Sequence, residues 1–151
     1  MYTEKKNSKL QTVFDLWEQN NNMVKDVTPF PDQDIICNDM ARAAYWSKCD
    51  MSKVYEQIHI IPEHVHKTAF ATVLGTFRSQ VMQMGDCNMP STFQQLMTAI
   101  FHNCISHFIH VYLDNIFIFL HPIEEHEIHL DIILQWLQDH HLFLSKAIIC
   151  N

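Results

Sequence analysis

Hydrophobic residues are densest between residues 107 and 120, which read HFIHVYLDNIFIFL. Two runs rich in Phe, Ile and Val flank a single polar pair, Asp114 and Asn115. Such a stretch is too short to span a bilayer, and a polar pair at its centre would be costly there. Two β-forming runs joined by a two-residue Asx turn are typical of an antiparallel hairpin, so we predict a hairpin with the Asp114 carboxylate at its tip. Taken alone, the stretch fits a plain core hairpin equally well, because Asx turns are common.

Helical spacing of apolar residues marks three other segments. Residues 35–46 predict a short amphipathic helix, which follows an extended polar linker at residues 20–34. Pro90 opens a second helix. The apolar stripe of this second helix consists of Phe93, Met97, Ile100 and Phe101.

The third helical segment follows Pro122 and covers residues 123–140. Its first turn is rich in glutamate, and the helix dipole favours acids at that end. One face of this helix is predicted to carry His126, Leu130, Ile133, Leu134 and Leu137.

Shorter segments of alternating polarity indicate β-strands. One strand is predicted to end at Asp50. The strands predicted after it cover residues 55–60, 67–74, 76–82 and 142–149. Gly75 joins the middle two, and the only other glycine is Gly85; glycine suits positions where φ is positive. Residues 5–20 predict either a strand behind a Lys-rich turn or a solvated N-terminal hairpin.

The resulting order of elements is strands, helix, hairpin, helix and strand. This order predicts an α+β fold with helices packed on one face of an antiparallel sheet. A chain of 151 residues is long enough for one domain that buries about 68–70% of its unfolded surface.

Composition indicates whether the protein is secreted or membrane-bound and whether its cysteines are paired. The N-terminus lacks the apolar core of a signal peptide, and no apolar stretch is long enough to cross a membrane, so we expect no membrane association. The five cysteines form no Cys-x-x-Cys pair. We therefore expect free thiols in a reducing intracellular compartment, cytoplasmic or nuclear, and no zinc knuckle.

The charge distribution is unusual. A formal net charge of −7 argues against a free-standing nucleic-acid binder. Seven of the ten Lys and Arg lie at or before Lys53, whereas all eleven His lie after it, against only two Arg in the whole chain.

Two acidic residues, Asp50 and Asp114, lie at ends of predicted strands. Two carboxylates that converge on one site can hold two divalent cations about 3.5–4 Å apart for in-line phosphoryl transfer. Sequence spacing alone does not show that these two carboxylates meet.

Histidine pairs offer a second possible metal site. His126 and His129 are three residues apart on a predicted helix, and His64 and His66 alternate. Neither pair has Cys or carboxylates at ligand spacing, so we expect satisfied or solvated histidines instead.

Several motifs follow one another along the chain: TVFDLWEQN (12–20), SKCDMSKVYEQIHI (47–60), KTAF (67–70), VMQMGDCNMPSTFQQLM (81–97), YLDN (112–115), EEHEIHL (124–130) and LFLSK (142–146). Together they resemble the fingers and palm of reverse transcriptases from gypsy-type LTR retrotransposons. The ordered set is far more specific than any one motif. It implies a polymerase fingers–palm fold with a ferredoxin-like palm. The resemblance places the fingers at about residues 1–28 and 58–89, and the palm at about 29–57 and 90–151.

The resemblance implies an RNA-directed DNA polymerase that acts on an RNA or DNA template-primer and dNTPs. Asp50 and Asp114 would hold two Mg²⁺ or Mn²⁺ ions, which activate the primer 3′-OH and stabilise the leaving pyrophosphate, with Asn115 beside them in the catalytic set. Tyr55 would exclude a 2′-OH sterically. The other implied nucleotide- or template-binding positions are Gln11, Met84, Gly85, Gln94 and Tyr112. Nothing in the motifs fixes an oligomeric state.

The chain departs from the family pattern at chemically important sites. Asn115 replaces the second Asp of the hairpin, and an amide oxygen can ligate a hard cation but adds no charge. Gln11 stands where the family usually has an Arg that grips the triphosphate, and Trp17 stands at another Arg position. Met84 and Val54 are further departures. Motifs of the thumb, connection, RNase H and integrase regions are absent, so we expect a truncated, degenerate piece with impaired activity.

The excess of His over Arg has one explanation that also covers Gln11, Trp17 and Asn115. His59 likewise stands where the family often has Arg. Single C-to-T changes on either strand turn CGN arginine codons into His, Gln, Trp or Cys codons, and turn Asp into Asn. Each Arg-to-His change removes a permanent cation, since neutral His dominates at pH 7. The alternatives to impaired DNA synthesis are therefore an inactive relic or a co-opted binding module that uses the palm as a scaffold; an acidic, His-rich ancestor would explain the same composition without decay.

Overall fold

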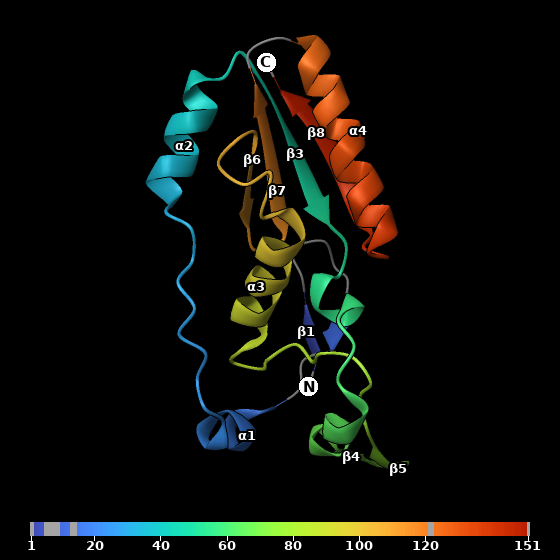
Figure 1. The fold of residues 1–151 in the computed structure, drawn as a ribbon. Coiled ribbons are helices and arrows are strands. Elements are labelled where there is room, and N and C mark those ends of the chain that lie inside the picture. Colours follow the sequence, from blue (N-terminus) through green and yellow to red (C-terminus); the bar gives the residue numbers. More distant parts are fainter. Residues whose placement is uncertain (1, 5–9, 13–14, 121–122, 151) are drawn as a thin grey trace. The chain divides into compact units, whose positions relative to one another are not determined.

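The chain folds into two units. The computed structural model describes the backbone of residues 2–4, 10–12, 15–120 and 123–150 (Figure 1). Unit 1 comprises Met1–Val27 and Tyr55–Pro90, and unit 2 comprises Thr28–Val54 and Ser91–Asn151. The names fingers and palm for these units stay a prediction.

Unit 2 is built on a four-stranded antiparallel sheet in the order β6-β7-β3-β8 (Figure 1). The strands are β3 (Tyr45–Met51), β6 (Ile109–Tyr112), β7 (Asn115–Leu120) and β8 (Leu144–Cys150). Side chains alternate between the two faces of a strand. Ser47 and Cys49 are fully buried, whereas the side chains of Lys48 and Asp50 are about one third exposed. One face of β3 therefore packs into the core, and the other carries an ammonium and a carboxylate.

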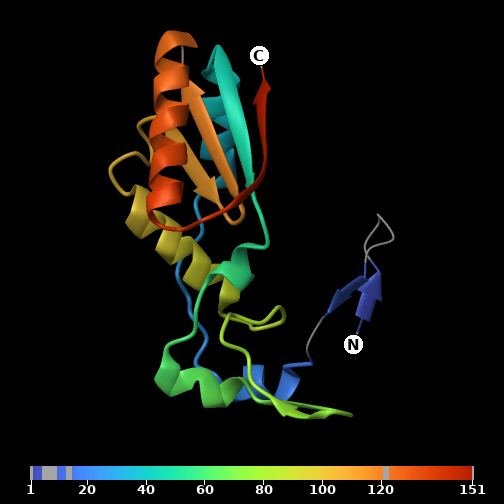
Figure 2. The same cartoon turned by 90° about the vertical axis from the view of Figure 1, so that its right-hand side faces the viewer.

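Helices α3 (Met89–Phe101) and α4 (Ile123–Asp139) supply the core that covers the buried face. α4 contacts β3 and β7 and runs alongside them (Figure 2). The ring of Phe101 on α3 stacks on that of Trp136 on α4, with centroids 5.9 Å apart. Among the described residues, the fully buried side chains on these two helices include Phe93, Met97, Phe101, Ile133 and Leu137. The predicted α+β fold class is confirmed, and Phe93, Met97 and Phe101 of the predicted α3 stripe are fully buried.

Helix α2 (Gln33–Arg42) lies beside the edge strand β6. Its start is set by Asp32, whose carboxylate accepts a 2.9 Å hydrogen bond from the Asp34 amide, the usual N-cap contact. Further along, Asp39 Oδ2 lies 2.8 Å from Nε2 of the buried His110. This contact satisfies a polar ring that the core would otherwise leave without a partner.

Unit 1 consists of short elements tied together by side-chain amides. Its elements are β1 (Tyr2–Glu4), β2 (Leu10–Thr12), α1 (Trp17–Asn22), the 3₁₀ helices η1 (Val54–Gln57) and η2 (Pro62–Thr68), β4 (Phe70–Thr72) and β5 (Gly75–Phe77). Asn20 Nδ2 donates to the Gly85 carbonyl at 2.8 Å, and Asn20 Oδ1 accepts from the Cys87 amide at 3.0 Å. Asn88 bonds the backbone of Val24 and Asp26. These bonds fix the linker after α1 against the loop that contains Gly85.

Two general expectations can be compared with the described residues. Of the helices in that part of the chain, none is both long and apolar enough to cross a membrane. The described cysteines, Cys37, Cys49, Cys87 and Cys104, are free thiols, as expected.

Three predicted strands are wrong in extent. Of residues 76–82, only Thr76 and Phe77 lie in a strand, β5, and Val81 makes a single isolated bridge. Residues 55–60 form the 3₁₀ helix η1 and one isolated bridge, His59 to Val81, because β3 ends in a turn where Lys53 has a φ of 44°. Residues 67–74 supply only the three residues of β4, since the 3₁₀ helix that Pro62 opens continues to Thr68. Alternation of polarity could not reveal this, because no neighbouring strand pairs with these residues over more than a few positions.

The buried stripe of α4 differs at one position from the prediction. Leu134 is 39% exposed, whereas the adjacent Ile133 is fully buried and Leu137 is 2% exposed. Successive residues on a helix are about 100° apart, so Ile133 turns its neighbour away from the sheet. Within residues 5–20, predicted to form a strand or a hairpin, residues 10–12 form β2, which pairs with β1, whereas residues 17–20 belong to the helix α1. Residues 5–9, 13 and 14 lie outside the described residues.

His126 is a buried histidine with one satisfied nitrogen. Its Nε2 lies 2.7 Å from the hydroxyl of the buried Ser47, and its Nδ1 has no partner among the described residues. Burial lowers the pKa of His126, and the nearby His129 lowers it further, while Glu127 partly offsets these effects. The folded protein therefore holds His126 in its neutral form.

We expect acidification to weaken unit 2 through this histidine. Because the pKa of His126 is lower in the folded state, the unfolded chain binds more protons below pH 6.5, and the free energy of unfolding falls until the pH passes the folded pKa. Each pKa unit of difference corresponds to about 1.4 kcal/mol. His126→Gln should flatten the pH dependence of urea unfolding between about pH 7 and 5, whereas His140→Gln, at the exposed end of α4, should keep the original slope. An unchanged slope in His126→Gln would contradict this assignment.

Candidate active site

The hairpin at the centre of the sequence forms, but its turn lies one residue earlier than predicted. Leu113 and Asp114 are the turn residues, and Asn115 is already the first residue of β7, paired with Tyr112. Asn115 joins the strand because it also pairs with Asp50 on β3. Leu113 takes a φ of 53°, a left-handed conformation that is strained for a side chain branched beyond Cβ.

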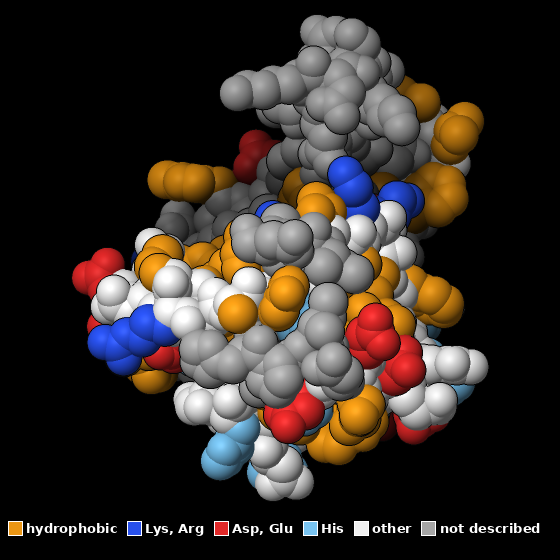
Figure 3. All heavy atoms as spheres, turned by 90° about the horizontal axis from the view of Figure 1, so that it is seen from above, with side chains coloured by type: hydrophobic (Ala, Val, Ile, Leu, Met, Phe, Trp, Pro, Cys, Tyr) orange, Lys and Arg blue, Asp and Glu red, His pale blue; other side chains and the backbone are white. Residues whose placement is uncertain are grey.

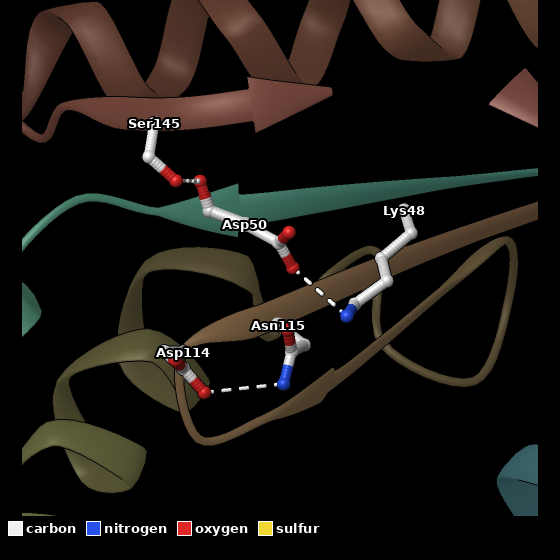
Figure 4. Close-up of polar contacts among 5 residues, drawn as sticks. All are labelled: Lys48, Asp50, Asp114, Asn115 and Ser145. Atoms are coloured by element: carbon white, nitrogen blue, oxygen red, sulfur yellow. Dashed lines mark hydrogen bonds and ion pairs between the residues drawn. The ribbon is translucent and has the colours of Figure 1, made fainter. Parts of the chain in front are cut away.

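The hairpin brings three of the predicted catalytic residues to one end of the sheet. Asp50 and Asn115 are directly opposite in the β3–β7 register, so their side chains leave the same face. The Met51 amide donates to the Asp114 carbonyl at 2.9 Å, which ties the turn to β3. Ser145 on β8 donates to the Asp50 carbonyl at 3.0 Å, which holds β3 from its other side (Figure 4). We call Asp50, Asp114, Asn115 and Lys48 the acidic corner.

Within the acidic corner each carboxylate has a donor from the chain. Lys48 Nζ lies 2.9 Å from Asp50 Oδ1, and Asn115 Nδ2 donates to Asp114 Oδ1 at 3.1 Å (Figure 4). Sequence reasoning missed Lys48. The signal was present, since residues two apart on a strand share a face.

Beneath the turn, Gln94 acts as a clamp. Its Nε2 donates to the Val111 carbonyl at 3.1 Å, and its Oε1 accepts from the Leu113 amide at 3.1 Å. The side chain is only 2% exposed. Both polar atoms of the Gln94 side chain thus bond the hairpin, so Gln94 supports the turn from helix α3. Its predicted role in nucleotide or template binding stays a prediction.

Tyr112 ends β6 and turns toward the segment before α2. Its hydroxyl accepts a hydrogen bond from Gln33, and its ring lies 6.3 Å from that of Phe30. The residue is half-buried, so part of the ring remains accessible beside the acidic corner.

The remaining predicted site residues belong to unit 1. Tyr55 lies in η1, and Gln11 lies in β2, with its side chain outside the described part. Met84 is 36% exposed beside Gly85, which has a φ of 115° as expected for a glycine position. Their predicted roles in nucleotide or template binding stay predictions.

Cys49 lies on the buried face of β3, opposite the face that carries Asp50. Burial raises the pKa of the Cys49 thiol to about 11, and the adjacent Asp50 carboxylate adds to that shift. The thiol is fully buried and neutral, so it is a packing residue rather than a ligand.

The donor set of the corner fits hard divalent cations, though with little charge. Carboxylate and amide oxygens from Asp50, Asp114 and Asn115 are the ligand types that Mg²⁺ and Mn²⁺ accept. The described residues include no group of three or more His, Cys, Asp and Glu placed to hold a metal. Any cation at this corner would therefore rely on two carboxylates.

The face of the molecule seen from above carries charged side chains of both signs (Figure 3). In Figure 3, acidic, basic and histidine side chains are scattered among hydrophobic ones over the coloured part of that face. A continuous basic surface, the usual footprint of nucleic-acid binding, is not seen among those residues.

Comparison with known proteins decides the family. A family model described as reverse transcriptase (RNA-dependent DNA polymerase) matches residues 3–147. The chain belongs to the reverse transcriptase family. Among relatives of this reverse transcriptase chain, the Pol polyprotein from transposon 297 of Drosophila melanogaster is 31% identical over 91% of the chain and 13% of the relative. The Pol polyprotein from transposon gypsy of the same organism is 25% identical over 93% of the chain and 14% of the relative.

The fold agrees with the family. The structure of the foamy viral protease–reverse transcriptase in complex with double-stranded DNA superimposes with a TM-score of 0.86 at 21% identity, over 95% of this chain and 25% of that one. An RNA-directed DNA polymerase homolog from Oenothera berteroana is 30% identical over 73% of the chain and 80% of its own length. The chain thus spans about an eighth of the transposon polyproteins that it matches. Both the α+β fold and the reverse transcriptase resemblance are confirmed.

Proposed function

We propose that this chain carries the fingers and palm of an RNA-directed DNA polymerase from a gypsy-type element, with impaired two-metal nucleotidyl transfer. The observation that supports this most is the β3–β7 register, which sets Asp50 opposite Asn115 with Asp114 at the adjoining turn. Asp50 and Asp114 would hold two Mg²⁺ or Mn²⁺ ions there. The ions supply the positive charge that activates the primer 3′-OH and offsets the charge of the leaving pyrophosphate.

The residues of the chain have distinct tasks in this proposal. Asp50 and Asp114 present carboxylate oxygens from neighbouring, hydrogen-bonded backbones, so the backbone needs little rearrangement for a cation to bind. Gln94 fixes the turn that carries Asp114. Asn115 is the weak point, because its amide adds no negative charge and its Nδ2 already contacts Asp114. Template-primer and dNTP are the proposed substrates.

Primer extension on a poly-rA template with Mg²⁺ or Mn²⁺ tests this function. We expect slow but measurable dNTP incorporation by the purified chain, and its loss in Asp50→Asn, because that change removes one of only two carboxylates. The matched control is Asp39→Asn, a carboxylate of α2 that pairs with His110 outside the corner. Incorporation that is absent, or that survives Asp50→Asn, would contradict the enzymatic proposal.

A second candidate is a decayed relic with no catalytic role. It is favoured by the contact between Asn115 and Asp114, and by the net charge of −7. The DNA of this locus, set against intact copies of the element in the same genome, distinguishes the two. An excess of C-to-T and G-to-A differences supports decay, whereas balanced and mostly silent differences show that the chain has been kept for a purpose.

A further inference from the structure

In the acidic corner, each carboxylate is in contact with a side chain of the protein itself. The Lys48 ammonium lies 2.9 Å from one oxygen of Asp50. The Asn115 amide donates to one oxygen of Asp114 (Figure 4). Each acidic group is thus satisfied by a neighbour from its own strand or turn, without help from any cation.

We propose that Lys48 and Asn115 make this corner self-neutralising, so that the fold needs no divalent cation and a cation must displace Lys48 from Asp50 in order to bind. The inference rests on the proposed function in one respect, namely that Asp50 and Asp114 are the cation ligands. It adds that the metal affinity of the corner is set by a lysine as well as by the missing carboxylate.

The register explains the part played by Asn115. Asn115 is directly opposite Asp50, so an aspartate in its place would put two carboxylates face to face across β3 and β7. Like charges at directly opposed positions destabilise a sheet. An ionised aspartate also has no hydrogen to donate to Asp114, so that contact would be lost as well. With Asn115 in place, the corner avoids both costs when no cation is bound.

Lys48 acts by competition. It lies two residues before Asp50 on β3, so both side chains leave the same face of the sheet. Their side chains are 34% and 32% exposed, which makes the ion pair partly solvated and therefore weak enough to be displaced. Lysine suits this role, because its ammonium is a point charge on a flexible stem that can move aside.

The test uses four variants of the full chain: Lys48→Met, Lys48→Arg, Asn115→Asp and Lys146→Met. Lys146 is the matched control. It lies opposite Asp50 in the β3–β8 register, but its side chain forms no ion pair with the described residues. Lys48→Arg keeps the cation and checks that any effect of Lys48→Met comes from charge. Bound Mn²⁺ is measured by electron paramagnetic resonance, and the melting temperature is measured in EDTA and in saturating Mn²⁺.

The original chain should unfold cooperatively in EDTA, because its fold needs no divalent cation, and saturating Mn²⁺ should raise its melting temperature less than that of Asn115→Asp. Lys48→Met should bind Mn²⁺ about fivefold more tightly, the factor expected for loss of a partly exposed ion pair, whereas Lys146→Met and Lys48→Arg should stay within about twofold of the original. Asn115→Asp should melt lower than the original chain in EDTA and regain stability in Mn²⁺. Its affinity should rise by about tenfold or more, because ligand charge strongly tunes the binding of hard cations.

Two results would overturn the inference. One is equal Mn²⁺ affinity in Lys48→Met and Lys146→Met. The other is stabilisation of the original chain by Mn²⁺ as large as that of Asn115→Asp. Either result would leave the proposed function standing, because cation binding at the corner would still be seen. Absence of Mn²⁺ binding in every variant is a different outcome, which would overturn both the inference and the metal site of the proposed function.

Discussion

Restoring two family residues at once, Asn115→Asp and Gln11→Arg, is expected to raise the rate of primer extension by roughly 10²-fold or more. Preorganised electrostatic groups in favourable sites are worth about 2.7–4 kcal/mol each. Under the proposed function, the two changes would add a carboxylate beside the metals and a cation for the triphosphate. The rate is measured on poly-rA template with Mg²⁺ and, separately, Mn²⁺.

The two single variants and one triple variant make this result interpretable. Asn115→Asp alone should change the dependence of the rate on metal concentration, whereas Gln11→Arg alone should mainly lower the apparent KM for dNTP. Adding Asp50→Asn to the pair should return the rate to background. If the double variant binds Mg²⁺ and Mn²⁺ no better than the original chain, the assignment of Asn115 to the metal site is wrong.

Truncation of one aromatic ring should have the largest effect on stability. Phe101 is fully buried at the end of α3 and stacks on Trp136 of α4. Phe101→Ala is expected to cost about 3–5 kcal/mol of unfolding free energy, from lost transfer energy plus the cavity left behind. Phe143→Ala removes the same ring from a site that is 66% exposed and should cost less than about 0.5 kcal/mol. Urea unfolding of both variants measures the difference, and equal costs would mean that α3 and α4 do not share a core.

The three longest helices and the central hairpin were the predictable part of the fold, whereas the short helix α1 was not predicted. Phe93, Met97 and Phe101 recur at helical spacing, and all three are fully buried in the structure. Long amphipathic segments carry their own register, because one face must be apolar whatever they pack against. The reverse transcriptase motifs added the order of elements, which periodicity alone could not supply.

The predictions for short segments were wrong for an identifiable reason. Residues 55–60 alternate in polarity like a strand, yet they form η1 and a single bridge from His59. A strand depends on its neighbour, and no local pattern reports whether a neighbour is available. The turn at Leu113 and Asp114 was likewise displaced by pairing between Asn115 and Asp50, which are far apart in the sequence.

At the candidate site, the identities of the residues were predictable and their contacts were not. The motifs gave Asp50, Asp114 and Asn115, which the structure brings to one end of the sheet. The ion pair of Lys48 and the two hydrogen bonds of Gln94 depend on side-chain directions that a sequence shows only through alternation. Their chemical roles remain for the experiments above.

The bonds of Gln94 to the Val111 carbonyl and the Leu113 amide couple helix α3 to the turn of the acidic corner. A displacement of α3 would therefore disturb the Leu113 backbone and, with it, the position of the next residue, Asp114. Substitutions at buried α3 positions such as Met97, which touch no substrate in the proposed mechanism, would then depress catalysis before they unfold the chain. A screen for loss of activity would therefore find substitutions in α3 as well as substitutions of Asp50 and Asp114. Suppressor mutations would distinguish the two groups. A compensating change in the core can restore the position of α3, whereas none can replace a missing carboxylate.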